Sequence, residues 1–240
     1  MTVALILASG VGARMGQDIP KQFLNVYDKP VIIYTLEAFQ KHPGIDFIQV
    51  VCLEGWHDIL KAYSKQFGIT KLEGVCSGGT DVHESIRNGI NAIKEHNHSD
   101  DDVVIIHDGV RPLVDTSVLS DVISKTNQYG NAVSSMPYNE QIFYKGEDKT
   151  TTTEYINRDK LQRVSTPQGY KLGKLLWAYE KAFRENIGIE GPTYVNTLMV
   201  DLGETLHFAS GSEMNIKLTT KENLEMFKAY LKMGQDDWVK

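Results

Sequence analysis

The chain has 240 residues, with 25 lysines and arginines against 31 aspartates and glutamates and a formal net charge of −6. Its 41% hydrophobic and 23% charged residues are typical of a globular protein, and residues 1–240 are expected to form a single domain. The acidic balance argues against bulk nucleic-acid binding. The longest apolar run, residues 3–8, is too short to cross a membrane, and no secretory signal is visible, so a cytoplasmic location is expected. Cys52 and Cys76 show neither metal-ligand spacing nor a disulfide framework.

Continuous apolar runs alternate with amphipathic stretches along the chain. Buried strands are predicted at 3–8, 47–53, 72–76, 103–106 and 132–136, and helices at 31–40, 57–67, 82–94 and 116–129. This alternation predicts an α/β, Rossmann-like fold with a mostly parallel sheet and helices on both faces. In such sheets ligands bind beyond the carboxyl ends of the strands, so motifs at those positions carry most weight.

Residues 137–161 interrupt the alternation. Their centre, 145–153, is polar and rich in threonine, and short apolar stretches flank it. The pattern predicts a protruding β-hairpin arm, which either lies free in solvent or contacts a second subunit. A further helix is predicted at 221–232.

The first motif follows the first predicted strand and reads Leu7-Ala-Ser-Gly-Val-Gly-Ala-Arg-Met-Gly16, with Ile19-Pro-Lys-Gln22 after it. Its glycines, including Gly10 and Gly12, let the backbone approach a ligand, and its N–H groups can hold phosphate oxygens. The spacing is neither the dinucleotide fingerprint nor a P-loop. Arg14 and Lys21 add two cations, which suit the charge that develops when a triphosphate loses pyrophosphate.

Two more motifs follow predicted strands. Gly78-Gly-Thr-Asp-Val-His-Glu-Ser85 opens a helix, where paired glycines allow a flat base to approach and Ser85 can hydrogen-bond to it; Asp81 there is expected to be a plain N-cap. In His107-Asp-Gly-Val-Arg-Pro112, Asp108 can accept hydrogen bonds from hydroxyl groups or help to hold Mg²⁺. Alternatively, Asp108 and Arg111 form a pair that only steadies the loop.

Together these motifs resemble, in order and over nearly the whole chain, the cytidylyltransferases that activate polyol phosphates. The resemblance implies a nucleotide-diphospho-sugar transferase type of fold, a homodimer formed through the arm, and Mg²⁺ on the triphosphate. It implies catalytic roles for Arg14, Lys21 and Lys217, the last within Asn215-Ile-Lys-Leu-Thr219. The implied nucleotide-binding residues are Ala8, Ser9, Gly10, Gly12, Gly79 and Ser85. The implied substrate-binding residues are Asp108, Arg111, Arg158 and Thr193, with Arg158 reaching the neighbouring subunit's site.

The chain departs from the family pattern at three places. Val82 stands where the family usually has arginine, and Gln141 lies where it has a Pro-x-x-Asp-Thr segment. Thr193-Tyr-Val-Asn-Thr197 replaces a threonine followed by aspartate. The last two departures concern the acceptor, so the reaction is better defined by sequence than the acceptor is.

The resulting expectation is an enzyme that transfers CMP from CTP to a polyol phosphate, giving a CDP-polyol and pyrophosphate. A pentitol phosphate such as D-ribitol 5-phosphate, used for surface polymers, is the favoured acceptor. 2-C-methyl-D-erythritol 4-phosphate, used for isoprenoids, is the alternative. A nucleotidyltransferase for another nucleotide and a non-catalytic nucleotide-binding protein are the rival readings, and the glycine spacing disfavours a dehydrogenase.

Overall fold

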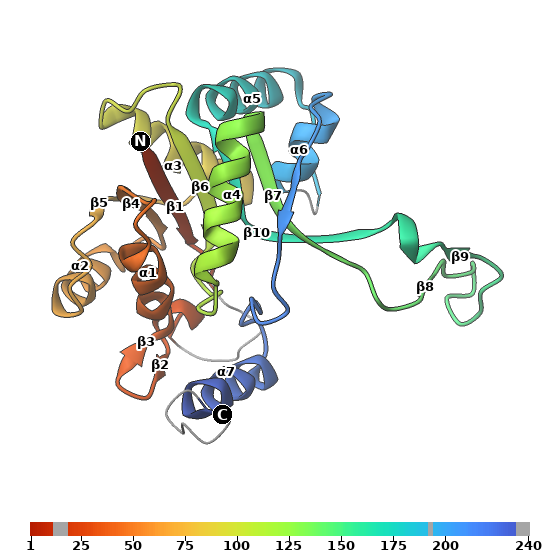
Figure 1. The fold of residues 1–240 in the computed structure, drawn as a ribbon, viewed down its shortest axis with the longest axis horizontal. Coiled ribbons are helices and arrows are strands. Elements are labelled where there is room, and N and C mark those ends of the chain that lie inside the picture. Colours follow the sequence, from red (N-terminus) through yellow and green to blue (C-terminus); the bar gives the residue numbers. More distant parts are fainter. Residues whose placement is uncertain (12–18, 192–193, 234–240) are drawn as a thin grey trace.

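A computed structural model describes residues 1–11, 19–191 and 194–233 of the chain. Its centre is a seven-stranded sheet in the order β11-β7-β10-β6-β1-β4-β5. Six strands share one direction and β10 runs against its neighbours β6 and β7 (Figure 1). The strands are β1 (Thr2–Ala8), β4 (Phe47–Cys52), β5 (Leu72–Ser77), β6 (Val103–Asp108), β7 (Asn131–Pro137), β10 (Gln162–Lys171) and β11 (Phe208–Ser210). The predicted mostly parallel sheet is confirmed.

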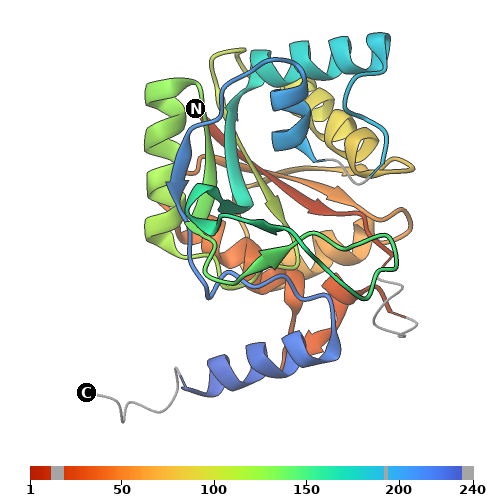
Figure 2. The ribbon, with the colours of Figure 1, turned by 90° about the vertical axis from the view of Figure 1, so that its right-hand side faces the viewer.

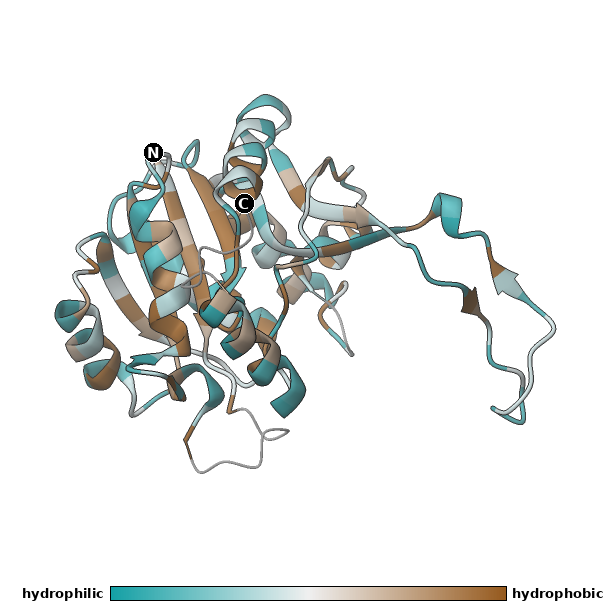
Figure 3. Cartoon of the chain, turned by 60° about the horizontal axis from the view of Figure 1, so that its bottom comes forward, coloured by the Kyte–Doolittle hydropathy of each residue, from teal (hydrophilic) through white to brown (hydrophobic). Residues whose placement is uncertain are grey.

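Helices cover both faces of this sheet, as the sequence predicts. On one face lie α1 (Val31–Lys41), α2 (His57–Gln66) and α4 (Thr116–Tyr129); on the other lie α3 (Val82–Glu95), α5 (Leu172–Glu185) and α6 (Val195–Asp201). Figure 2 shows the sheet between α4 and the α3, α5 and α6 layer, and Figure 3 shows the hydrophobic strands between them. Alternate residues of β1 enter opposite cores, Ala4 and Ile6 on one side and Val3 and Leu5 on the other. Burial on both faces explains why β1 is apolar throughout.

The direction of chain progression reverses between β1 and β6. From β1 the chain adds β4 and β5 on one side, and then returns to place β6 on the other side. The carboxyl ends of β1 and β6 therefore open onto a crevice at the switch point of the sheet.

Four elements of the main sheet and of the helices that cover it were not predicted: β10, α5, α6 and β11. The interior of β10 is polar in sequence, with Ser165, Thr166 and Gln168 before the buried Tyr170, so it does not show the continuous apolar pattern of the parallel strands. Its place between β6 and β7 depends on tertiary pairing rather than on local pattern.

The arm between β7 and β10 protrudes from the body (Figure 1). It carries the short paired strands β8 (Ile142–Phe143) and β9 (Tyr155–Ile156), followed by the 3-10 turn Arg158–Lys160. Phe143, Tyr144 and Tyr155 are each more than half exposed on it. Strands β8 and β9 make this segment a hairpin.

A smaller third core holds α7 (Lys221–Met233) against the body. Phe227 of α7 packs with Val26 of β2 (Asn25–Val26), Val31 and Leu218; β2 pairs with β3 (Lys29–Pro30). The 3-10 turn η2 (Lys21–Phe23) precedes β2. No helix among residues 1–11, 19–191 and 194–233 is long and apolar enough to span a membrane.

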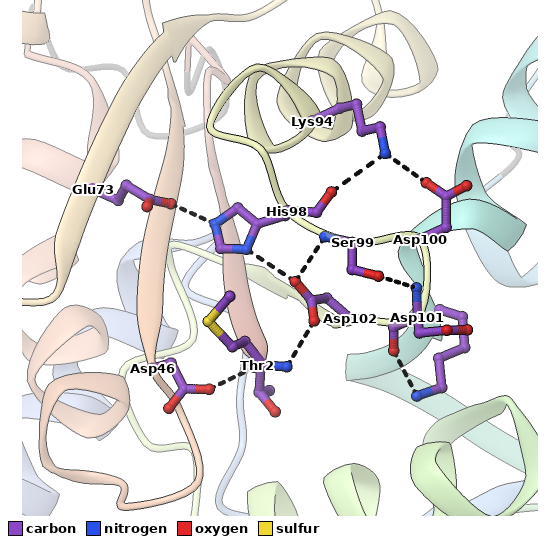
Figure 4. A network of polar contacts seen from close by, with 11 residues as sticks. Thr2, Asp46, Glu73, Lys94, His98, Ser99, Asp100, Asp101 and Asp102 are labelled. Carbon is purple, nitrogen blue, oxygen red and sulfur yellow. Dashed lines mark hydrogen bonds and ion pairs between the residues drawn. The ribbon is translucent and has the colours of Figure 1, made fainter.

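At the amino ends of the strands, a polar network closes the sheet on the side opposite the crevice (Figure 4). The buried His98 contacts Glu73 through Nε2 at 2.8 Å and Asp102 through Nδ1 at 3.2 Å. The Ser99 amide also donates to Asp102, and the Thr2 amide donates to Asp46. The Met1 ammonium donates to Asp102 at 2.7 Å, so the network joins the residue before β1 to the α3–β6 loop and to β5.

Candidate active site

Two adjoining cavities lie at the carboxyl ends of β1 and β6. The larger, of about 430 Å³, is lined by Leu7, Ala8, Ser9, Gly10, Val11, Lys21, Gln22, Leu53, Gly79, Thr80, Asp81, Val82, Ser85, Asp108, Val110 and Lys217. The smaller, of about 260 Å³, is lined by Leu7, Val82, Ile86, Ile106, Asp108, Arg111, Val164, Ser165, Thr166, Gln168, Tyr194, Val195, Asn196 and Lys217. Leu7, Val82, Asp108 and Lys217 line both, so the two cavities meet at this shared wall.

The loop that leaves β1 is fixed at its start by Gln22. This side chain is 1% exposed and donates from Nε2 to the carbonyls of Ala8 at 2.7 Å and Gly10 at 3.0 Å. Because a buried side chain donates to both carbonyls, the backbone at the start of the loop is held in one conformation beside the larger cavity.

The opposite wall of the larger cavity is the turn between β5 and α3. Ser85 Oγ accepts from the Gly79 amide at 3.0 Å and from Ser9 Oγ at 3.1 Å, and donates to the Asp81 carbonyl at 2.7 Å. The Asp81 side chain accepts from the Glu84 amide, so Asp81 is the predicted N-cap of α3. A Cβ at Gly79 would meet the Glu84 side chain, so this turn requires glycine. Ser9 and Ser85 thus tie the two walls together.

Asp108 lies at the junction of the two cavities and holds two cations. Its Oδ2 accepts from Arg111 Nε at 2.8 Å and its Oδ1 accepts from Lys217 Nζ at 2.9 Å. Burial raises the pKa of Asp108, but Lys217 and Arg111 outweigh burial and hold that pKa well below its ordinary value. Asp108 is therefore an anion that positions both cations.

Segments far apart in the chain hold these cations in place. Arg111 Nη1 donates to the Asn215 carbonyl at 2.7 Å, and Asn215 Nδ2 donates to the Thr166 carbonyl at 2.6 Å. The Leu218 amide donates to the Val110 carbonyl at 2.9 Å, which places Lys217 beside the end of β6. Loops after β6 and β11 and strand β10 therefore build one charged junction.

His107 lies below this junction and is fully buried. Its Nε2 contacts the Arg111 carbonyl at 3.1 Å, which fixes the tautomer with the proton on Nε2, and Nδ1 has no hydrogen-bond partner. Burial lowers the pKa of His107 to about 4. The imidazole is neutral near neutral pH and supports the loop, as expected for a structural histidine.

The structure brings most predicted site residues together. The larger cavity collects Ala8, Ser9, Gly10, Lys21, Gly79, Ser85, Asp108 and Lys217, and Arg111 lines the smaller one. Arg158 lies in the arm, where its Nη1 donates to the Asn139 carbonyl at 2.8 Å, and it lines neither cavity. Gly12, Arg14 and Thr193 lie outside the described residues.

Several residues at the site have no role in the sequence prediction, among them Gln22, Thr166, Asn196 and Asn215. Gln22 and Asn215 lie in the same motifs as Lys21 and Lys217. Their place in these motifs is the feature of the sequence that could have identified them as site residues. Thr166 and Asn196 lie on β10 and α6, whose position beside the cavity follows only from the topology.

Comparison with known proteins agrees with this architecture. Residues 2–233 match the family model described as IspD, 2-C-methyl-D-erythritol 4-phosphate cytidylyltransferase. The chain is 56% identical to a ribitol-5-phosphate cytidylyltransferase of Lacticaseibacillus paracasei, over 97% of this chain and 98% of the relative. It is 37% identical to a 2-C-methyl-D-erythritol 4-phosphate cytidylyltransferase of Clostridium tetani, over 95% of this chain and 89% of the relative.

Solved structures share the fold. The 4-diphosphocytidyl-2C-methyl-D-erythritol synthase of Anaerococcus prevotii superposes with a TM-score of 0.80 at 23% identity, covering 96% of each chain. The Francisella tularensis 2-C-methyl-D-erythritol 4-phosphate cytidylyltransferase gives a TM-score of 0.74 at 26% identity, covering 95% of this chain and 98% of that one. Because the family model covers residues 2–233 and the relatives are 37% and 56% identical over nearly the whole chain, the chain belongs to the IspD cytidylyltransferase family.

Proposed function

We propose that this protein transfers CMP from CTP to the phosphate of D-ribitol 5-phosphate, giving CDP-ribitol and pyrophosphate. The observation that carries the proposal is the pair of cavities that meet at Asp108 and Lys217. A transfer between two phosphates needs two binding spaces with a cationic junction between them. The larger cavity suits the nucleotide and the smaller one suits the acceptor.

The chemistry is an in-line displacement at the α-phosphorus of CTP. A phosphate oxygen of the acceptor forms the new bond, the bond to the bridging oxygen of the β-phosphate breaks, and pyrophosphate leaves with the electron pair. The acceptor phosphate is already an anionic nucleophile, so no proton has to be removed by a base. Catalysis then consists of positioning and of stabilising charge on the transferred group.

Three cations are assigned to that charge: Lys21, Lys217 and Arg14. Lys21 lines the larger cavity but not the smaller one, whereas Lys217 lines both cavities. The ion pair with Asp108 at 2.9 Å holds the Lys217 ammonium at the junction before substrate binds. Lys217 is therefore assigned to the α-phosphate and Lys21 to the rest of the triphosphate.

The proposal includes Mg²⁺ bound largely by the triphosphate. Among the described residues there is no group of three His, Cys, Asp or Glu side chains that could hold a metal by itself. Asp108 would offer a carboxylate oxygen to the ion at the junction, because Mg²⁺ commonly takes one or two carboxylates together with substrate phosphates. When bound, the ion would neutralise charge on the phosphates and the leaving pyrophosphate.

The acceptor is proposed from sequence similarity. The 56% identical relative is named a ribitol-5-phosphate cytidylyltransferase, as is a 38% identical relative in Vibrio parahaemolyticus. The alternative acceptor, 2-C-methyl-D-erythritol 4-phosphate, is supported by the family description and by the 37% identical Clostridium tetani relative. CDP-ribitol would serve surface-polymer synthesis, and the reaction is proposed to take place in the cytoplasm.

We also propose a homodimer in which Arg158 completes the partner's site. The arm displays the exposed side chains of Phe143, Tyr144 and Tyr155, and Arg158 follows these on the same projection. The test is a mixture of two inactive variants, Arg158→Ala and Lys21→Ala, co-expressed with different tags. Mixed dimers contain one complete site in two, so a random mixture should show about a quarter of wild-type activity. Activity at the level of the two separate variants would refute the shared site.

The main test measures pyrophosphate release by the full chain with Mg²⁺, each of four nucleoside triphosphates and a panel of polyol and sugar phosphates. CTP with D-ribitol 5-phosphate should exceed every other pair by at least about tenfold in kcat/KM. CTP without acceptor is the control for hydrolysis. Preference for 2-C-methyl-D-erythritol 4-phosphate would establish the alternative, and absence of release with every pair would refute transfer.

A further inference from the structure

The wall of the smaller cavity contains a buried amide that the protein leaves without a partner. Asn196 lines this cavity from α6 and is 9% exposed. Its Oδ1 is buried without a hydrogen-bond partner, and its carboxamide makes no hydrogen bond to any other described residue. Such an amide is unfavourable unless water or a ligand supplies the missing partners.

The position of Asn196 is set by its neighbours on α6. Val195, Leu198 and Met199 are 0–3% exposed and belong to the core between α5, α6 and the sheet. Because these side chains hold the helix in place, the backbone of Asn196 is fixed beside the cavity. The chain therefore keeps one acceptor and two donors at a fixed place in the cavity wall.

Gln168 provides the comparison within the same cavity. It is also buried, but its Oε1 accepts from the Tyr170 hydroxyl at 3.0 Å and its Nε2 contacts the Ser165 carbonyl at 3.4 Å. The hydrogen-bonding groups of Gln168 are used inside the protein, whereas those of Asn196 are unused. Of these two buried amides, only Asn196 is available to a ligand.

The charges in the cavity indicate which part of a ligand Asn196 meets. Arg111, Lys217 and Asp108 gather at the junction with the larger cavity, where the acceptor phosphate has to lie for transfer. The described wall around Asn196 on α6 carries no charged side chain, since its neighbours are Tyr194 and Val195. A neutral amide that both donates and accepts matches a hydroxyl group, which does the same.

We propose that Asn196 determines acceptor specificity by hydrogen-bonding one hydroxyl group on the carbon chain of the polyol phosphate. The proposal rests on the transfer reaction proposed above and extends it to a named group of the acceptor. A site with an amide waiting for a hydroxyl disfavours an acceptor that lacks it, because the amide then remains buried without a partner.

The test compares D-ribitol 5-phosphate with its singly deoxygenated analogues in wild type, Asn196→Ala and Asn196→Leu. In wild type, removal of one particular hydroxyl should lower kcat/KM by about tenfold or more. In both variants the value for the full acceptor should fall by about 10- to 100-fold, and sensitivity to that hydroxyl should disappear. The KM for CTP should stay within about twofold of wild type, because Asn196 does not line the larger cavity.

Thermal unfolding separates this positioning of substrate from a structural role. Leucine shares the branched shape of asparagine but has no polar atoms, and its larger volume can extend into the cavity that Asn196 lines, so the Tm of Asn196→Leu should stay close to that of wild type. Asn91→Ala, on the exposed face of α3, is the matched control and should retain the wild-type hydroxyl profile. A lowered Tm together with an unchanged sensitivity to each acceptor hydroxyl would refute the role of Asn196 but leave the proposed transfer reaction intact. Wild-type protein that transfers CMP to no acceptor would instead refute the proposed function.

Discussion

The larger and the smaller cavity share one wall, yet they differ in how their polar side chains are used. Around the larger cavity, Gln22 satisfies two backbone carbonyls and Ser85 makes three hydrogen bonds within the protein. Around the smaller cavity, Asn196 makes none and Tyr194 is 53% exposed. The first wall is held together by its polar groups, whereas the second leaves the Asn196 amide for a ligand although Gln168 in the same wall is bonded within the protein.

This difference has a chemical reason under the proposed reaction. A triphosphate presents many anionic oxygens that backbone amides and cations can bind, and Gln22 fixes the two carbonyls at the start of the loop beside it. An acceptor polyol differs from other polyols only in its neutral hydroxyl groups. Side chains that are unused inside the protein can distinguish those hydroxyl groups, and changing such side chains need not disturb the fold.

The largest expected effect is at Lys21. Replacement by alanine removes a cation from the larger cavity, and loss of one group that stabilises transition-state charge commonly lowers turnover by about 10²- to 10³-fold. Pyrophosphate release with CTP and D-ribitol 5-phosphate measures the change, and thermal unfolding checks the fold. Turnover near wild type would contradict the assignment of this cavity to the triphosphate.

His107 tests the junction that both cavities share. Its pKa of about 4 in the folded protein lies below the ordinary value of 6.5, so below pH 6.5 the unfolded chain takes up a proton that the native chain does not. Stability conferred by the neutral imidazole is therefore complete above pH 6.5 and falls towards pH 4, by about 3 kcal/mol in total for a shift of this size. Asp108 acts in a separate window: its lowered pKa gives stability above pH 4 that is lost only at more acid pH.

Urea unfolding of wild type and His107→Gln between pH 7 and pH 4 measures this effect. The glutamine cannot titrate and retains an N–H donor for the Arg111 carbonyl. Between pH 6.5 and pH 4 the unfolding free energy of the variant should therefore depend less steeply on pH, by the slope that corresponds to about one proton. His42 and His83 also have pKa values lowered by burial, so the wild-type curve alone is not sufficient. Parallel curves for the two proteins would show that His107 does not titrate in this window.

The parts of the fold and of the site that could be predicted from sequence are those in which a motif directly follows an apolar strand. The loop after β1, the turn after β5 and the end of β6 each follow such a strand, and all three reach the larger cavity. The sheet pattern predicts their meeting because parallel strands end at a common edge. Most of the sheet and the larger cavity were therefore predictable.

The smaller cavity was less predictable because its wall comes from β10 and α6. The polar run Ser165-Thr-Pro-Gln168 precedes the one buried tyrosine of β10, and α6 has only seven residues. Neither gives a periodic signal, and both are placed by pairing and packing with distant segments. Asn196 in particular has no feature in the sequence that marks it; its burial and lack of a partner appear only in the folded chain.

Gln22 tests the claim that the wall of the larger cavity is held by internal hydrogen bonds. Replacement by leucine leaves the carbonyls of Ala8 and Gly10 without their buried donor. The free energy of unfolding should fall by about 1–3 kcal/mol, and the KM for CTP should rise by about tenfold. The KM for the acceptor should change little, because Gln22 does not line the smaller cavity. Equal increases in both KM values would show that the walls are not independent.

The smallest expected effect is at Tyr194, at the rim of the smaller cavity. Its hydroxyl has no hydrogen bond to another described residue, and the side chain is 53% exposed, so Tyr194→Phe removes no interaction that the fold uses. Unfolding free energy should stay within about 0.5 kcal/mol of wild type, and the KM for the acceptor should change by less than about threefold. Asn196→Leu in the same wall should preserve stability but impair the acceptor reaction strongly. If Tyr194→Phe impaired the acceptor reaction as strongly as Asn196→Leu, the Tyr194 hydroxyl at the rim and the Asn196 amide would share recognition of the acceptor. Acceptor specificity would then be a property of the whole wall of the smaller cavity rather than of one buried amide.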